Sequence, residues 1–382
     1  MPLPRPTFRA LLFLLLFCLT ALRGMGQALE SFTYQVNASE VTITGFASNY
    51  QGAVEIPQTI QGKPVTIIAT GAFRACSGVT SVVIPNSVTT IGNTAFQNCT
   101  ALSFMSLPPS VKAIEAYAFS GCTVLGNTTL PAGLTSLGTN AFAGCHAITS
   151  MAIPAGITVI PAGVFGGCKN LSSVSLPSGT VTISTGAFSG CVRLQSIDLP
   201  ASITSIETLA FNGCALTSFA FPSGVTVVSS GVLWDCKSLV SVTIPAGVTI
   251  VDNNAFFNCT ALAQVIFAGN SVTSIGLGAF RDCVSLASLD LPDGIFSIGS
   301  EAFANCDSLT ELELPTGLYI VGDALKGCTS LRELVIGTRL TQNPNSPNLF
   351  GGSSLNLRHL SIKATPGYTP VGKPVPLTHW SL

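Results

Sequence analysis

The stretch from Ala187 to Pro200, AFSGCVRLQSIDLP, decides the fold of this chain, because its pattern recurs along most of the sequence. The pattern reads A-F-x-x-C-x-x-L-x-x-V-x-I-P, and a V-T-x-I segment then leads back to the next Ala-Phe pair. Self-similarity at a fixed period of 20 to 50 residues is typical of solenoids. Successive cysteines lie 22 to 24 residues apart, at Cys76, Cys99, Cys122, Cys145, Cys168, Cys191, Cys214, Cys236, Cys259, Cys283, Cys306 and Cys328.

Each repeat carries the alternation of a β-strand. Ile197 and Leu199 are two residues apart, so they face the same side of a strand. Pro200 then ends the strand, since proline cannot donate to the ladder. The V-T-x-I segment returns along another side of the coil, and a glycine after it, such as Gly138, can supply a positive φ if the turn needs one. No unit buries its apolar positions alone, so neighbouring units must stack.

The unit resembles the bacterial surface-protein-A type (BspA-like) leucine-rich repeat. The motifs A-F-x-x-C and L-P-x-x-V-T-x-I-G carry the resemblance, which covers about residues 50–340. We therefore expect a leucine-rich-repeat solenoid: a β-rich, right-handed coil with a parallel β-sheet on the inner face, short turns or 3-10 segments outside, and little α-helix. Departures such as Ala268 and Gly337, in place of the strand-ending proline, affect local geometry rather than the fold. The resemblance implies an exported protein that acts in adhesion and protein binding rather than catalysis.

The sequence divides into five segments. Residues 1–28 read as a signal peptide, because Arg5 and Arg9 precede the 13-residue apolar run Ala10 to Leu22, which is shorter than the roughly 20 residues of a membrane span. We expect an N-terminal β cap over 29–57, leucine-rich repeats of about 23 residues over 58–340 and a degenerate last repeat or C-terminal cap over 341–363. Four prolines make 364–382 a Pro-rich tail.

Charge is scarce and nearly balanced. The 382 residues include 16 Lys and Arg against 17 Asp and Glu, and only 9% are charged. A nucleic-acid partner is not expected, since phosphate binding requires concentrated positive charge. We expect no transmembrane segment in the mature chain, secretion or a cell-surface location, and a monomer.

The twelve repeat cysteines allow three interpretations. Exported proteins often carry disulfides, and cysteines also bind metals. Zinc sites need close ligand clusters such as C-x₂-C, which are absent from the sequence. Disulfides need Cα atoms within about 7 Å. Free cysteine behaves as a small hydrophobic residue, so we favour a structural column of buried thiols and expect no metal or cofactor.

Outward positions of the later strands turn acidic, and the best candidate for a partner surface is formed by Asp198, Asp290, Glu311, Glu313 and Glu333. These acidic residues could instead form an ordinary solvated surface or a cation site, although a calcium site needs several converging oxygens. The three histidines share no motif, and no catalytic residue is predicted. We expect an exported, non-catalytic binding or adhesion scaffold for an extracellular protein or glycan. The alternatives are a structural cell-envelope repeat protein and an exported hydrolase on a repeat scaffold.

Overall fold

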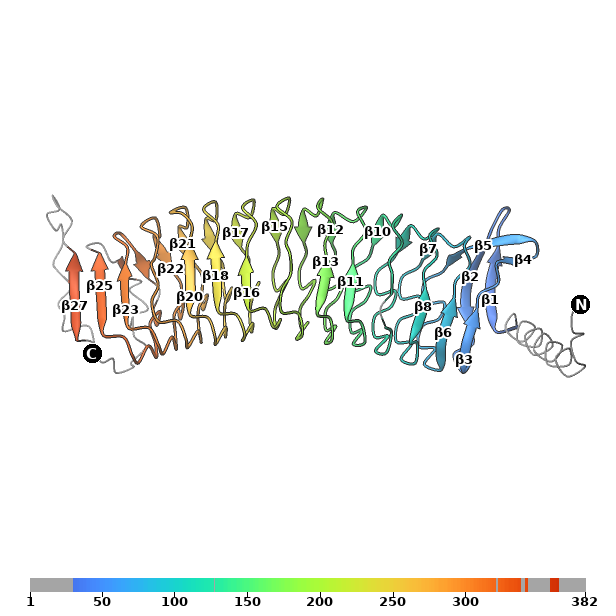
Figure 1. Ribbon diagram of the computed structural model, residues 1–382, viewed down its shortest axis with the longest axis horizontal. Coiled ribbons are helices and arrows are strands. Elements are labelled where there is room, and N and C mark those ends of the chain that lie inside the picture. The colour runs from blue at the N-terminus through green and yellow to red at the C-terminus, as the bar shows by residue number, and fades with distance from the viewer. Residues whose placement is uncertain (1–29, 127, 321, 338–340, 343–357, 364–382) are drawn as a thin grey trace, which may run out of the picture.

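The computed structural model describes residues 30–126, 128–320, 322–337, 341–342 and 358–363. The chain winds into one elongated, gently bowed stack of coils, with the N-terminal coils at one end and the C-terminal coils at the other (Figure 1). From Phe32 onward, every regular element of the described residues is a β-strand. The prediction of a leucine-rich-repeat solenoid is confirmed. The predicted signal peptide, the predicted tail and most of the predicted last repeat lie outside the described residues.

The L-x-x-V-x-I segments form one side of the stack, which we call the long-strand row. In the part of the chain that the structure describes, its strands pair in parallel in four groups, with three gaps between them. The groups are β3 (Gly52–Glu55), β6 (Val79–Val83) and β8 (Phe104–Ser106); β11 (Ser150–Ala152) and β13 (Ser173–Ser175); β16 (Ser218–Ala220), β18 (Ser241–Ile244) and β20 (Gln264–Phe267); and β23 (Glu311–Leu314), β25 (Glu333–Gly337) and β27 (His359–Lys363).

The V-T-x-I segments form a second run of parallel strands, which we call the short-strand row. Sequence reasoning placed this segment on another side of the coil but did not identify it as a strand. Most of its strands are two residues long, because each coil turns again at once. They are β5 (Lys63–Ile68), β7 (Thr90–Ile91), β9 (Ala113–Ile114), β10 (Ser136–Leu137), β12 (Val159–Ile160), β14 (Thr182–Ile183), β15 (Ser205–Ile206), β17 (Val227–Val228), β19 (Ile250–Val251), β21 (Ser274–Ile275), β22 (Ser297–Ile298), β24 (Tyr319–Ile320) and β26 (Thr341–Gln342).

One continuous core runs between the two rows. The repeat phenylalanines are fully buried and stack from coil to coil, as in the pair Phe96 and Phe119, whose ring centroids are 5.4 Å apart and whose planes differ by 7°. Leu233 interrupts this column, and Phe211 packs instead edge-on against Phe219. Stacked aromatic pairs add to the free energy of burial, so each coil is held by contact with the next.

The A-F-x-x-C turns form a third side of the stack, which we call the turn edge. Two positions in every such turn have a positive φ, one directly before the cysteine and one four residues earlier. The residue before the cysteine is Gly, Asn or Asp in every coil except the first, where it is Ala75. These residue types tolerate the left-handed conformation best. The backbone amides of a turn donate alternately within the turn and to the next coil. The Gln97 amide donates to the Thr94 carbonyl of its own turn, and the Phe96 amide donates to the Ala118 carbonyl of the next coil.

The glycine after the returning strand has a different role from the one predicted. Gly138 has no positive φ. A Cβ at this position would lie 2.3 Å from the backbone nitrogen of Ala116. Gly138 is therefore small because neighbouring coils approach closely there, and the left-handed turns are made elsewhere.

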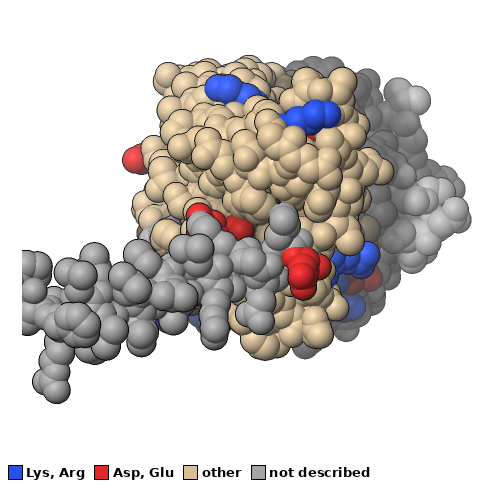
Figure 2. All heavy atoms as spheres, turned by 90° about the vertical axis from the view of Figure 1, so that its right-hand side faces the viewer, with Lys and Arg blue, Asp and Glu red and all other residues tan. Residues whose placement is uncertain are grey.

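An antiparallel hairpin lies at the N-terminal end of the stack. Its strands are β1 (Phe32–Val36) and β2 (Val41–Phe46), and β2 pairs in parallel with β5, while β4 (Thr59–Ile60) forms a second hairpin with β5. Phe46 stacks on Phe73, the first phenylalanine of the column, with centroids 4.8 Å apart. The hairpin thus covers the first repeat, and a cap over the whole of 29–57 stays a prediction. Few charged side chains are visible on this end of the molecule (Figure 2).

Candidate functional site

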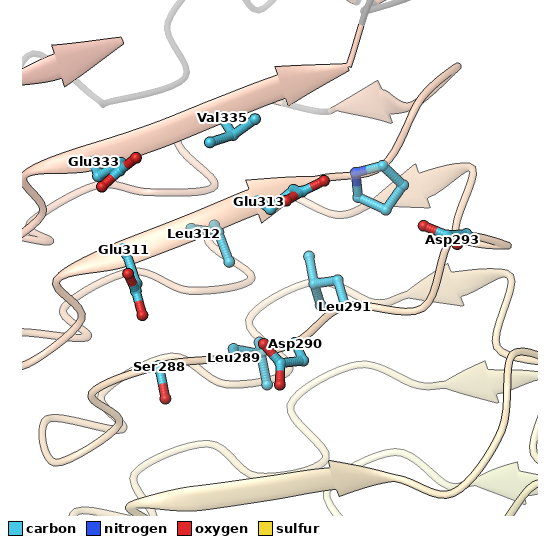
Figure 3. Close-up of a pocket in the computed structure, with 11 residues that line it drawn as sticks. Ser288, Leu289, Asp290, Leu291, Asp293, Glu311, Leu312, Glu313, Glu333 and Val335 are labelled. Atoms are coloured by element: carbon cyan, nitrogen blue, oxygen red, sulfur yellow. The ribbon is translucent and has the colours of Figure 1, made fainter. Parts of the chain in front are cut away.

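The long-strand row is hollowed where its third interruption lies. No strand forms in the described stretch from Leu286 to Leu291, between β20 and β23. This stretch follows the one coil of 24 residues, from Cys259 to Cys283, in which Ala268 replaces the strand-ending proline. The result is a shallow hollow of about 410 Å³ beside β23 and β25 (Figure 3).

Four of the five predicted acidic residues line this hollow. Glu311 and Glu313 project from β23 and Glu333 from β25, while Asp290 comes from the stretch without a strand (Figure 3). Asp198 is exposed but is not part of the hollow. Asp293, which sequence reasoning did not select, lines it as well. We name these five lining carboxylates (Asp290, Asp293, Glu311, Glu313 and Glu333) the acidic hollow.

The arrangement concentrates like charge. Glu311 lies directly opposite Glu333 in the parallel register of β23 and β25, and like charges in direct cross-strand positions destabilise a sheet. Among the described residues, no basic side chain forms an ion pair with Asp290, Glu311 or Glu333. Leu291 and Val335 add apolar lining. The hollow is therefore electrostatically complementary to a cationic group that also carries apolar surface.

The described residues contain no group of three or more His, Cys, Asp and Glu side chains placed to hold a metal ion. The acidic side chains are spread along two strands and a loop rather than converging on one point (Figure 3). This geometry suits several charges on an extended partner better than a single ion. His146, one of the three histidines, has its Nδ1 2.9 Å from the carbonyl oxygen of Gly167.

A second hollow marks the first interruption of the long-strand row. It measures about 600 Å³ and its lining is mainly apolar, with Phe104, Leu107, Leu130 and Ile153 among the lining residues. Thr128 occupies the inward position that Met105 and Met151 hold in the neighbouring coils, and its Oγ1 donates to the carbonyl oxygen of Gly126. A side-chain bond of this kind competes with strand pairing. The sequence signal for this hollow is Thr128, a threonine at a position where other coils carry valine or methionine.

The twelve repeat cysteines form one buried column of free thiols. From Cys99 onward, each thiol donates to the carbonyl oxygen of a residue one coil back, with S···O distances of 3.0 to 3.2 Å. Burial raises the pKa of Cys76 to about 11 and the pKa of Cys168 and Cys236 to about 12. These thiols remain protonated at neutral pH, and only the thiolate is a good nucleophile or metal ligand.

These features define a class of protein: a repeat solenoid with two rows of parallel strands and a shared core. No helix among the described residues is long and apolar enough to cross a membrane. Residues 39–172, 158–270 and 262–365 match the family described as the BspA type leucine rich repeat region. The matched segments cover most of the chain, so the protein belongs to the BspA-type leucine-rich repeat family.

Solved structures of similar proteins share the fold. A leucine-rich repeat protein from Bacteroides ovatus is 28% identical over 82% of this chain and 98% of its own, with a TM-score of 0.56. A leucine rich cell surface protein from Faecalibacterium prausnitzii is 27% identical over 88% of this chain and 94% of its own, with a TM-score of 0.59. A comparison with curated proteins finds no relative of this chain.

Proposed function

We propose that this protein is an exported, non-catalytic scaffold that binds an extracellular protein at or near the cell surface. Membership of a leucine-rich-repeat family supports a binding role, because extended solenoid faces suit large partners. One of the similar structures is described as a cell surface protein. The apolar run from Ala10 to Leu22 behind Arg5 and Arg9 supports export.

The observation that carries the proposal is the acidic hollow. Three of its carboxylates, Glu311, Glu313 and Glu333, are held on hydrogen-bonded strands, so little backbone entropy is lost there when a partner docks. Its apolar residues can pack against the aliphatic stems of Lys and Arg, while the carboxylates meet the charged heads. The partner that fits is a protein segment rich in Lys and Arg.

The test uses residues 29–382 and a set of extracellular matrix proteins, together with a synthetic Lys- and Arg-rich peptide as a defined probe. Binding is measured by surface plasmon resonance at low and at physiological salt. Glu311→Gln combined with Glu333→Gln is expected to weaken peptide binding by at least about tenfold, which corresponds to about 1.4 kcal/mol. Higher salt should weaken binding to the unchanged protein as well, because exposed charges are screened.

Asp198→Asn is the matched control, since it removes an exposed carboxylate of the same row outside the hollow. It should leave peptide binding within about twofold. Equal losses in the two variants would show that net charge, and not the hollow, drives the interaction. No binding of the peptide or of any matrix protein would overturn the proposal.

A further inference from the structure

The outer edge of β1 is an open strand edge at the N-terminal end of the stack (Figure 1). β1 is the first strand of a seven-stranded sheet, and β2 is the only described strand that pairs with it. In an antiparallel pair, alternate residues point their backbone N–H and C=O groups away from the neighbouring strand. The outward-pointing groups of β1 can therefore pair with another strand, and such edges are templates for pairing between chains.

This edge lacks the features that usually prevent pairing. Natural edge strands are blunted by charged side chains, prolines or β-bulges. The five residues of β1, FTYQV, include no charged residue and no proline. The register shift beside Thr33 comes from an extra residue in β2, Thr44, and not from β1. β1 itself thus keeps an unbroken alternation of its side chains.

The two faces of β1 differ in polarity. Phe32 is buried, and Tyr34 and Val36 are half-buried against the end of the core. Thr33 and Gln35 are exposed on the opposite face. In the described part of the chain, the end of the core is therefore only partly covered, and a further strand beside β1 would cover more of Tyr34 and Val36. Burial of apolar surface of this kind is the main driving force of protein association.

We propose that β1 pairs in antiparallel with β1 of a second copy of this chain, about a two-fold axis through Tyr34. Identical strand edges are self-complementary in this arrangement. Phe32 of each copy then lies opposite Val36 of the other, and Thr33 lies opposite Gln35. The apolar residues of both strands share one face, and the polar residues share the other. A register shifted by one residue would place apolar side chains opposite polar ones, so the pattern of β1 selects this register.

Two observations identify a second copy as the occupant of this edge. A two-fold axis brings a strand next to its own kind, so an edge that pairs with itself must avoid like charges, and β1 is uncharged. The pairing also rests in part on the proposed export, because removal of the predicted signal peptide leaves only residues 29 and 30 before Ser31. So short a segment cannot fold back to pair with β1.

The paired molecule would present its binding sites at both ends. The acidic hollow lies beside β23 and β25, at the end of the stack far from β1 (Figure 1). The two hollows of the dimer therefore lie at opposite ends of one long rod, and such bivalency strengthens attachment to a surface that displays many basic segments. The sequence alone predicted a monomer, since the open edge is visible only in the structure.

Sedimentation equilibrium of residues 29–382 over a range of protein concentrations tests the pairing. We expect a monomer–dimer equilibrium. Thr33→Lys combined with Gln35→Lys places lysine opposite lysine at both polar pairs and should weaken the dimer by at least about tenfold, because like charges opposite each other destabilise a sheet. Thr33→Lys combined with Gln35→Glu places lysine opposite glutamate at both pairs and should keep the dimer within about threefold of the unchanged protein.

The two variants share one substitution and differ only at Gln35, so any damage to the fold by Thr33→Lys affects both, and circular dichroism checks the fold of each. Ser173→Lys with Ser175→Lys adds the same charge to the exposed face of β13 and should leave the dimer unchanged. The proposal is overturned if the protein stays monomeric at every concentration, or if the two charge variants associate equally.

The proposed protein-binding function fails or holds independently of the dimer. Glu311→Gln with Glu333→Gln changes only the acidic hollow and should not alter dimerisation. The variant that carries Thr33→Lys and Gln35→Lys should still bind the Lys- and Arg-rich peptide at its own acidic hollow. A protein that dimerises without binding the peptide would refute the proposed function alone, and a monomer that binds the peptide would refute the dimer alone.

Discussion

Tyr117 occupies a left-handed backbone conformation at a position where five of the twelve described turns carry glycine. Its φ is 56°, and the equivalent residues in two later coils are Gly163 and Gly186, with φ of 58° and 62°. The left-handed conformation costs a residue with a Cβ about 1 kcal/mol. The turn edge keeps this conformation because the Tyr117 amide donates to the carbonyl oxygen of Thr139 in the next coil.

Replacing Tyr117 therefore tests how much strain the turn stores. Tyr117→Gly and Tyr117→Ala remove the same ring, but only glycine relieves the positive φ. We expect the glycine variant to be more stable than the alanine variant by about 0.5–1 kcal/mol. Urea unfolding followed by circular dichroism measures the difference. Equal stability of the two variants would mean that the turn carries no strain at this residue.

The buried columns of the core could be predicted from the sequence, because the residues that recur with the repeat period are the ones that are buried. Any residue that recurs every 23 positions in a stack occupies the same place in each coil, so the cysteines and phenylalanines had to form columns. The sequence also shows Gly, Asn or Asp before nearly every cysteine. That these residues have a positive φ follows only from the backbone angles of the structure. The pairing of Glu311 with Glu333 also follows from the period.

At the scale of the strand, the first gap in the long-strand row coincides with a polar side chain at an inward position. Thr128 replaces an apolar residue in the long-strand row and bonds to its own neighbouring backbone, and the row is interrupted there. No strand forms in the described residues 128–130, and the hollow lined by Leu130 lies at this place. Thr128 is the sequence signal for this hollow, whereas the place of the acidic hollow was not predictable, since it depends on where strand pairing fails and not on the repeat pattern.

Thr128→Val should allow a strand at residues 128–130 that pairs with β8 on one side and with β11 on the other. Valine fits the inward position and removes the competing hydroxyl, so we expect a gain of about 1 kcal/mol in the free energy of unfolding. Hydrogen exchange should show slower exchange of the amides from Thr128 to Leu130. Thr180→Val is the control, because Thr180 is also buried, but its hydroxyl bonds to Pro177 in a turn away from this row. Unchanged exchange at Leu130 in the Thr128 variant would contradict the explanation.

At the scale of the whole molecule, stability is shared between neighbouring coils and is lowest at the ends. Repeat stacks open from their termini, where a coil has only one neighbour. The buried cysteines report this opening because each coil carries one. Burial raises the pKa of Cys328 to about 12, and this thiol is protected while its coil stays closed.

The rate at which a maleimide labels each cysteine at pH 7.5, measured by mass spectrometry, should therefore depend on the position of its coil along the stack. We expect Cys328 and Cys306 to react first and Cys191, in the middle, to react last. Cys76 should react more slowly than Cys328, because the hairpin of β1 and β2 covers its end. The same reagent applied to the chain in urea is the control and should label all sites at similar rates. Simultaneous labelling in the folded protein would indicate that the stack opens as one unit.

Because the twelve thiols are free, no disulfide among them cross-links one coil to another. A pulling force along the chain can therefore release coils one at a time, and each released coil of about 23 residues adds roughly 75 Å of contour length. If such a protein joins a cell to a surface, it acts as an extensible tether whose coils unfold under load and refold afterwards. A disulfide-linked solenoid of the same length would not extend, and the load would instead break its attachment.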